Sequence, residues 1–183
     1  MATALLPLQD SVTTLHYEPQ ARFDFCGTLV EGKLIIYGGR SFEHDTGPPR
    51  YVDLLDISSG RWKHVLTSGI PPNAIYGVAH ASIGTFVYAF GGGDEERSYY
   101  DTLHRFDIYN KVWTILEPTN SSSTPTPKIG ASMIVYKKLL VMFGGHYFSN
   151  SFKIQMDDIH RLVCYDIDNS KSKYYGQKSY MCF

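Results

Sequence analysis

The sequence has no cluster of basic residues and no long apolar run. Its 183 residues include 17 Lys and Arg against 18 Asp and Glu, which gives a formal net charge of -1. Because nucleic-acid-binding domains concentrate positive charge, this balance argues against a nucleic-acid partner. No apolar stretch approaches the roughly 18 residues of a membrane-spanning helix, and the start MATALLPLQD lacks the basic segment of a secretory signal. We therefore expect a soluble, non-secreted protein without a membrane partner.

Cysteine is scarce, and the common catalytic motifs are missing. The three cysteines, Cys26, Cys164 and Cys182, are an odd number without the spacing of metal ligands. This cysteine usage is typical of a reducing compartment, so we expect a cytoplasmic location, with the nucleus as a further one. GxSxG, HExxH and P-loop motifs are absent, and the seven histidines are scattered. We expect no enzymatic activity, no metal and no other cofactor.

Glycine, in contrast, recurs in pairs, and each pair ends a short apolar run. The three runs read GKLIIYGGRS, TFVYAFGGGD and KLLVMFGGHY. Their glycine pairs follow one another at a constant step of 53 residues, at Gly38 and Gly39, Gly91 and Gly92, and Gly144 and Gly145. The prolines Pro19, Pro72 and Pro125 keep the same step. A constant period near 50 residues predicts a repeat architecture, in which each repeat is one supersecondary unit.

Each repeat has the pattern of four antiparallel strands. In the first repeat, apolar runs separated by turn residues place the strands at about 23–30, 34–39, 52–57 and 61–66. The second repeat gives strands at about 76–83, 86–91, 102–108 and 112–116. In both repeats an aspartate, a polar turn and a tryptophan join the last two strands, at Asp56 and Trp62 and at Asp107 and Trp113. The sequence therefore predicts an all-β fold.

These features resemble the kelch repeat, the blade of a kelch β-propeller. The glycine pairs, the two tryptophans and the aspartates Asp56, Asp107 and Asp166 carry the resemblance. The stretches GIPPNAIYGVAHASIGTFVYAFGG and PTPKIGASMIVYKKLLVMFGG are most similar to kelch-domain-containing proteins without a BTB domain. The resemblance implies three four-stranded blades at 19–71, 72–124 and 125–176, flanked by segments 1–18 and 177–183. In such a fold, glycine permits close backbone approach near the central channel, and tryptophan packs between blades.

The third repeat departs from the pattern, and three blades do not close a ring. Six residues after Asp166 stands Ser172 instead of tryptophan, and the nearest aromatic residue is Tyr174. We therefore expect a degenerate last strand at about 173–176. Propellers close with about four to eight blades, so we expect a partial kelch propeller whose open blade edges favour self-association. Segment 1–18 is expected to supply an extra outer strand.

The long connections between strands are the expected partner-binding face, because long loops on a rigid scaffold commonly carry function. The loops at 40–51, 93–101 and 146–157 all lie at one end of the blades. The resemblance further implies that Arg22 and Lys128, each three residues after a repeat proline, anchor a carboxylate or an acidic peptide. The candidate binding residues of this face are Arg22, Arg40, Arg50, Tyr51, Arg97, Tyr99, Lys128, His146, Tyr147 and Phe148.

Together these features predict a non-catalytic module that presents its loops to a peptide or protein partner. The resemblance implies a role as substrate receptor of a cullin-RING ubiquitin ligase, with components of that ligase as partners. The alternatives are a cytoskeletal or small-GTPase-associated scaffold of the kelch type and a truncated fragment of a longer propeller. With 18 residues before the first blade, no BTB domain is expected in this chain.

Overall fold

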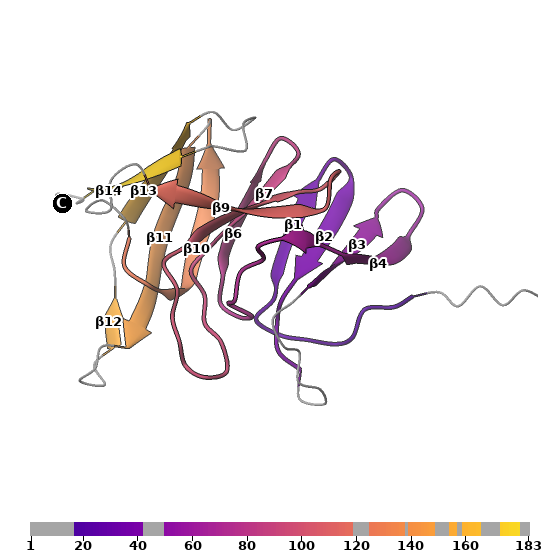
Figure 1. Ribbon diagram of the computed structural model, residues 1–183, viewed down its shortest axis with the longest axis horizontal. Coiled ribbons are helices and arrows are strands. Elements are labelled where there is room, and N and C mark those ends of the chain that lie inside the picture. Colours follow the sequence, from indigo (N-terminus) through magenta and orange to yellow (C-terminus); the bar gives the residue numbers. More distant parts are fainter. Residues whose placement is uncertain are drawn as a thin grey trace, which may run out of the picture.

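Strands form all the regular secondary structure that the computed structural model describes. It describes residues 17–41, 50–118, 125–137, 139–148, 154–156, 159–165 and 173–179. Within these ranges no helix is long and apolar enough to cross a membrane. The strands build three antiparallel meanders, called here the first, second and third sheet, which stand side by side in chain order, with a parallel pairing that joins the last two (Figure 1). The described strands do not close into a ring, so the prediction of an all-β partial propeller is confirmed.

The first sheet is a meander in which each strand pairs with the next one in the sequence. Its strands are β1 (Cys26–Val30), β2 (Lys33–Tyr37), β3 (Tyr51–Asp56) and β4 (Arg61–Leu66). The first hairpin turns at Glu31 and Gly32, whose φ angles of 46° and 73° are those of a type I′ turn. This turn matches the twist of the flanking strands and so fixes the register between β1 and β2.

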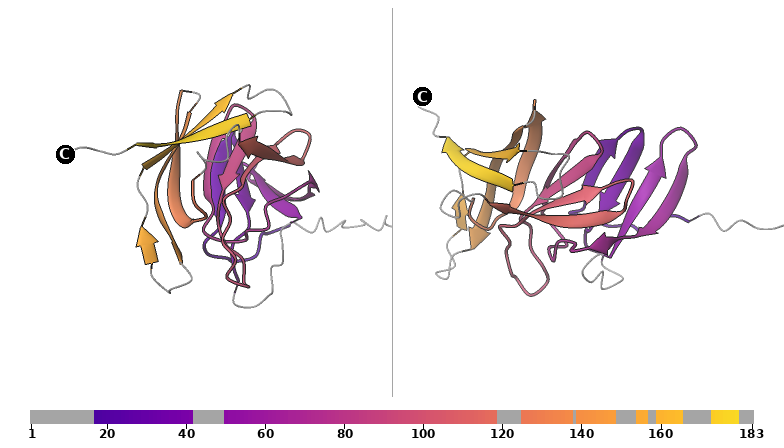
Figure 2. Two further views of the ribbon diagram at one scale, coloured as in Figure 1. Left: turned by 60° about the vertical axis from the view of Figure 1, so that its left-hand side comes forward. Right: turned by 45° about the horizontal axis from the view of Figure 1, so that its top comes forward.

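The second and third sheets repeat this meander. The second comprises β6 (Ala79–Ile83), β7 (Phe86–Phe90), β8 (Leu103–Asp107) and β9 (Val112–Pro118). The third comprises β10 (Ile129–Tyr136), β11 (Leu139–Phe148), β13 (Ile159–Tyr165) and β14 (Lys173–Ser179). Among the first strands of the sheets, β6 lies between β1 and β10 and contacts both, and Figure 2 shows the three sheets side by side in two further views.

Short parallel pairings join each sheet to the next at their last strands. The two-residue strand β5 (Ser68–Gly69), which follows the first sheet, pairs with Val112 and Trp113 at the start of β9. The end of β9 pairs in the same way with Lys173 and Tyr174 at the start of β14. Each connecting segment therefore fastens the sheet that it leaves to the last strand of the sheet that follows.

The last strand of the third sheet is present, although its sequence departs from the repeat. In the first two sheets each tryptophan pairs with the residue just before the motif aspartate, as Trp113 pairs with Phe106. In the third sheet that position, Tyr165, pairs with Lys173, and Tyr174 pairs with Cys164. The hairpin is one residue longer than in the other sheets, which shifts Tyr174 by one position from the tryptophan register.

The apolar core lies between the sheets and consists of two clusters. The strand β7 contributes to both, because alternate side chains of a strand point to opposite faces. Val87 and Ala89 join the cluster against the first sheet, whereas Tyr88 and Phe90 join the cluster against the third. The second sheet is therefore covered on both faces, which accounts for the nearly continuous apolar sequence of β7.

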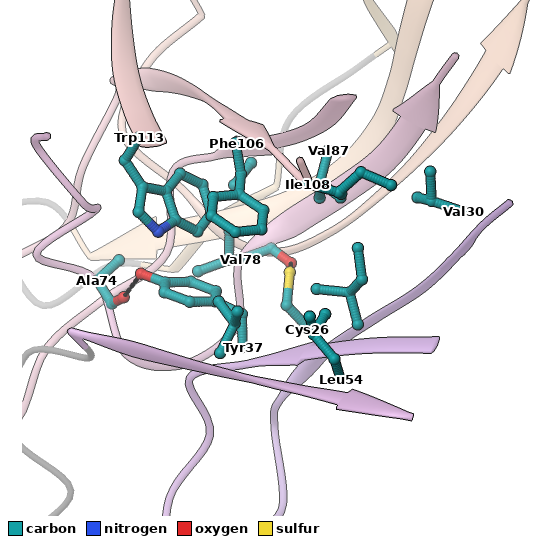
Figure 3. Packing of buried hydrophobic residues seen from close by; sticks show 13 residues of the cluster. Cys26, Val30, Tyr37, Leu54, Ala74, Val78, Val87, Phe106, Ile108 and Trp113 are labelled. Carbon is teal, nitrogen blue, oxygen red and sulfur yellow. Dashed lines mark hydrogen bonds between the residues drawn. The ribbon is translucent and has the colours of Figure 1, made fainter. Parts of the chain in front are cut away.

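Trp113 fills the seam between the first and second sheets (Figure 3). Its side chain is 2% exposed, and its ring centroid lies 4.9 Å from that of Tyr37 and 4.8 Å from that of Phe106. Tyr37 donates a hydrogen bond of 2.9 Å to the carbonyl oxygen of Ala74, which ties the first sheet to the segment that enters the second. Trp62, the counterpart of Trp113 in β4, is only partly buried, because no described strand packs outside the first sheet.

The glycine pairs lie where the backbone of one sheet touches the segment that leads into the next. Gly39 donates a hydrogen bond of 2.5 Å to the carbonyl oxygen of Ile75, and Gly92 donates one of 2.8 Å to that of Lys128. The preceding glycines, Gly38 and Gly91, have φ angles of 63° and 70°. A Cβ atom on Gly38 would stand 2.6 Å from the carbonyl oxygen of Ile75, and one on Gly91 would stand 2.6 Å from that of Lys128. Glycine is therefore required here both by the backbone conformation and by the close approach of the next blade.

The two outer faces of the array carry exposed apolar side chains. Leu29 and Leu66 on the first sheet are each 60% exposed, and Ile134 and Phe143 on the third are 63% and 60% exposed. The equivalent faces of the second sheet are covered by its neighbours. These open faces are the surfaces on which the expected self-association would depend, and that association stays a prediction.

Candidate partner-binding face

Arg40 is held between two aromatic rings at the loop end of the first two sheets. Its guanidinium carbon lies 5.1 Å from the ring centroid of Phe23 and 4.0 Å from that of Tyr76. Asp24 accepts a hydrogen bond of 2.6 Å from the same guanidinium. Mutual backbone hydrogen bonds between Phe23 and Arg40, of 2.9 and 2.8 Å, fix the strand end that carries both side chains. The arginine side chain remains 38% exposed, so it is preorganised and still reaches solvent.

The loop between β7 and β8 is ordered by one of its own residues, Asp94. The carboxylate of Asp94 accepts a hydrogen bond of 2.8 Å from the amide of Ser98 and one of 2.6 Å from the hydroxyl of Tyr100. Burial, together with this hydrogen bond and the negative charge of Asp94, raises the pKa of Tyr100 to about 12. The tip residue Arg97 is exposed and has a φ of 65°. The loop thus presents Arg97 in a defined conformation.

The structure brings this loop next to Arg40 and the rings of Phe23 and Tyr76 that enclose it, an arrangement that we call the Arg40 clamp. Gly93 pairs with Tyr76 on one side and with Tyr99 on the other. Burial raises the pKa of Tyr76, the neighbouring Tyr99 and Asp94 raise it further, and the charge of Arg40 opposes this effect. We call the surface formed by Phe23, Arg40, Tyr76, Arg97 and Tyr99 the seam patch. It combines aromatic rings and arginines, the residue types that are enriched at protein interfaces.

Arg22 serves a different purpose from the one expected. Its guanidinium donates 2.8 Å to Asp53 and 3.2 Å to the carbonyl oxygen of Gly38. Asp53, which is 1% exposed, also accepts a hydrogen bond of 2.6 Å from the hydroxyl of Tyr17 and one of 2.6 Å from Nδ1 of His64. Burial and the neighbouring carboxylate raise the pKa of the Tyr17 hydroxyl to about 12. A buried carboxylate needs such partners, so Arg22 stabilises the first sheet and is only partly available to a ligand.

Lys128 is also not offered at the surface. Its residue is 1% exposed, although the sequence position suggested a cation at the rim of the channel. Its backbone connects the second and third sheets, because its amide donates to Tyr100 and its carbonyl oxygen accepts from Gly92. Lys128 therefore lies between the second and third sheets, at the position that Ile75 occupies between the first and second sheets.

The remaining candidates lie apart from the seam patch. Tyr51 stacks on the imidazole of His64, with ring centroids 4.3 Å apart, on the outer face of the first sheet, and Arg50 precedes it. His146, Tyr147 and Phe148 belong to β11 and pair with β12 (Ile154–Met156), so this stretch is not the loop that was expected. The side chains of Tyr147 and Phe148, and most of the loop beyond them, lie outside the described residues, as does Asp166.

Two functional features escaped the sequence reasoning. Tyr76 completes the Arg40 clamp but stands in a connection with no motif to mark it. Asp53 does carry a signal, since it is a single acidic residue inside the otherwise apolar stretch YVDLL at the start of β3. A carboxylate at such a position is expected to be buried with partners.

Comparison with known proteins gives a consistent result. Residues 10–179 match the family model described as the KLHDC2/KLHL20/DRC7 Kelch-repeats domain. The chain is 32% identical over 116 residues to "Rab9 effector protein with kelch motifs" of Gallus gallus, which covers 62% of this chain and 30% of the relative. It is 30% identical over 106 residues to "Kelch domain-containing protein 10" of Rattus norvegicus, which covers 58% of this chain and 26% of the relative.

A third relative has a further domain in its name. "Acyl-CoA-binding domain-containing protein 5" of Arabidopsis thaliana is 28% identical over 132 residues, which covers 72% of this chain and 19% of the relative. The chain thus spans less than a third of the length of each of these relatives. The family match covers nearly the whole chain and agrees with three four-stranded sheets joined at glycine seams, so this protein belongs to the kelch-repeat family, whose blades generally serve interaction and not catalysis.

Proposed function

We propose that this chain is a non-catalytic protein-interaction module that binds a peptide or protein through the seam patch. The observation that supports this function best is the Arg40 clamp. An arginine that is already fixed between Phe23 and Tyr76 loses little conformational freedom when a partner binds. The neighbouring tip residue, Arg97, adds a second cation from the adjacent sheet. Two arginines among aromatic rings suit a partner that carries carboxylates.

The finer role that we propose is that of a substrate receptor of a cullin-RING ubiquitin ligase. Membership of the kelch-repeat family and the cationic seam patch support this role. The ligand would be the C-terminal tail of a substrate, whose free carboxylate an arginine can bind through two parallel hydrogen bonds. Arg22 is held by the buried Asp53 and Lys128 lies in the seam, so we assign the contact to Arg97 and to Arg40, whose own partner Asp24 is exposed.

Replacing Arg97 by alanine is expected to weaken the binding of C-terminal tail peptides by about tenfold, the effect of losing one charge-assisted hydrogen bond. Fluorescence polarisation with labelled peptides, each made with a free carboxylate and as an amide, measures this loss. The wild-type chain should prefer the carboxylate form. Lys137→Gln, a change in the turn between β10 and β11 at the other end of the third sheet, is the matched control.

Near-UV circular dichroism should show that both variants retain the wild-type fold. Equal binding of carboxylate and amide peptides, together with unchanged binding by the Arg97 variant, would exclude tail recognition by the seam patch.

A second candidate function is that of a scaffold for a small GTPase. One relative is named an effector of Rab9, which favours this candidate over a cytoskeletal role. The two functions can be separated with purified Rab9 loaded with a GTP analogue or with GDP. A scaffold of this kind would bind only the GTP form, and tail peptides would not compete with it.

A further inference from the structure

A groove lies between the first and second sheets at the end opposite the seam patch. It has a volume of about 170 Å³ and is lined by the strand ends and turns of both sheets. Its floor is apolar and consists of Leu54 and Val65 from the first sheet and Ile108 from the second. Leu54 and Ile108 are 7% and 2% exposed, so the floor continues the packed core between the sheets.

Four cations surround this floor. Lys33 from β2, Arg61 and Lys63 from β4 and Lys111 from the turn after β8 all line the groove. The strand register explains why three of them converge. Asp56 pairs with Lys33 on one side and with Arg61 on the other, and Lys63 stands opposite Leu54 two residues away. Cross-strand neighbours on one face of a sheet lie about 5 Å apart, so this face gathers its positive charges in one place.

One carboxylate, that of Asp56, also lines the groove and stands between Lys33 and Arg61, so four cations face one carboxylate. Its Oδ1 accepts hydrogen bonds from the hydroxyls of Ser58 and Ser59 and from the amide of Ser59, which hold the pKa of Asp56 at about 2. Asp107 accepts the amides of Tyr109 and Asn110, and Glu31 accepts the hydroxyl of Tyr109. None of the ion pairs in the described part of the chain involves any of the four cations.

Lys111 shows that these positive charges oppose one another. The first sheet has Gly60 at the equivalent turn position, and both residues adopt a left-handed φ, of 67° for Gly60 and 60° for Lys111. A lysine in this conformation is less favourable than glycine. Its side chain is partly buried and donates to the carbonyl oxygen of Ile108. Burial lowers the pKa of Lys111, the charges of Lys33 and Lys63 lower it further, and Asp107 opposes them.

We propose that this groove binds the phosphate of a phosphorylated side chain on a partner protein. A phosphate monoester carries about two negative charges and three acceptor oxygens, so it can accept hydrogen bonds from several separate cations at once. The apolar floor would hold the carbon part of the same side chain. The groove is recessed between two sheets and has room for one side chain, which favours a peptide over a lipid surface. The site is independent of the seam patch, because the two lie at opposite ends of the sheets.

The test uses the purified 183-residue chain with phenyl phosphate as the first probe and benzoate as the matched carboxylate. Titration calorimetry is expected to show saturable binding of phenyl phosphate and weaker binding of benzoate. Backbone amide shifts in NMR spectra should change first at Lys63, Ile108 and Lys111. Replacing Arg61 and Lys63 by glutamine should weaken the binding of phenyl phosphate at least tenfold, whereas Lys137→Gln should leave it unchanged.

A second arm identifies the source of the phosphate. A leucine-flanked phosphotyrosine peptide should bind with the same dependence on Arg61 and Lys63, and its unphosphorylated form should not bind. Three results would overturn the proposal. They are no saturable binding of phenyl phosphate, equal binding of benzoate, and binding to vesicles with phosphoinositide headgroups without any binding of the phosphopeptide. Because the Arg97 variant keeps this groove intact, it should bind phenyl phosphate like the wild type.

Discussion

Replacing Gly91 by alanine is expected to lower the free energy of unfolding by about 3 kcal/mol or more. Gly91 has a φ of 70°, and a Cβ atom at this position would lie 2.6 Å from the carbonyl oxygen of Lys128 and 3.2 Å from that of Tyr100. Both contacts are with backbone atoms, which cannot rotate away as a side chain can. The second and third sheets would have to separate locally, and the hydrogen bond from Gly92 to Lys128 would be lost with them.

The chain supplies its own control for this prediction. Gly144 occupies the same motif position in the third repeat and has the same φ of 70°, but a Cβ atom there would have no atom of the described residues within 4 Å. Gly144→Ala should therefore cost only about 1 kcal/mol, the penalty of the left-handed conformation alone. Urea unfolding of the two variants measures the difference. Equal losses would mean that backbone conformation, and not contact between the sheets, requires glycine in this motif.

Acidification is expected to reduce the stability of the chain through His104, a residue of β8. His104 is 7% exposed and lies edge-on to Trp113, with ring centroids 6.5 Å apart. Burial lowers the pKa of its imidazole from 6.5 to about 4, against the weaker effect of a hydrogen bond with the backbone of Thr102. In the unfolded chain the imidazole takes up a proton as the pH falls below about 6.5, whereas in the folded chain it stays neutral down to about pH 4.

The sign of this effect follows from the depressed pKa of the folded state. Protonation of the unfolded chain favours unfolding, so stability is full above about pH 6.5 and falls by about 3 kcal/mol on going to pH 4. Asp56 contributes little in this window, because the unfolded chain protonates it only near its ordinary pKa of 3.8 and the folded chain only near 2. The measurement is the unfolding free energy of wild type and of His104→Gln between pH 7 and 4.5. The difference between the two curves should shrink steadily with falling pH. A constant difference would show that His104 is not held neutral in the folded chain.

The sequence predicts the repeats well because their requirements are local. A 53-residue step of glycine pairs, with alternating apolar strands between them, is visible without knowing what the strands contact. The positions of Gly38 and Gly91 could be explained in advance by close backbone approach, although the partner carbonyl groups could not be named. The parallel pairing of β5 with β9 was not predictable, because two residues, Ser68 and Gly69, carry no strand pattern of their own.

The candidate site was predictable only in part, because it depends on contacts between distant segments. Arg97 and Arg40 were chosen from their loops, and the structure links these loops only through the pairing of Gly93 with Tyr76 and Tyr99, so their joint role stays a prediction. Arg22 looked equally suitable in the sequence, but Asp53, 31 residues away, accepts its hydrogen bond. Lys128 was taken for a cation at the rim of the channel because it stands three residues after the repeat proline Pro125. Its burial follows from the contact between the second and third sheets, which no local pattern indicates.

Amide hydrogen exchange at Gly39 and Gly92 tests most directly whether the blades stack at glycine seams and so assemble the seam patch. These amides donate to the carbonyl oxygens of Ile75 and Lys128 in the following repeat. They should therefore exchange as slowly as the amides of β7, at the core of the second sheet, whereas Arg97 in the exposed loop tip should exchange quickly. Exchange at Gly39 and Gly92 as fast as at Arg97 would contradict the stacked arrangement and the patch that depends on it.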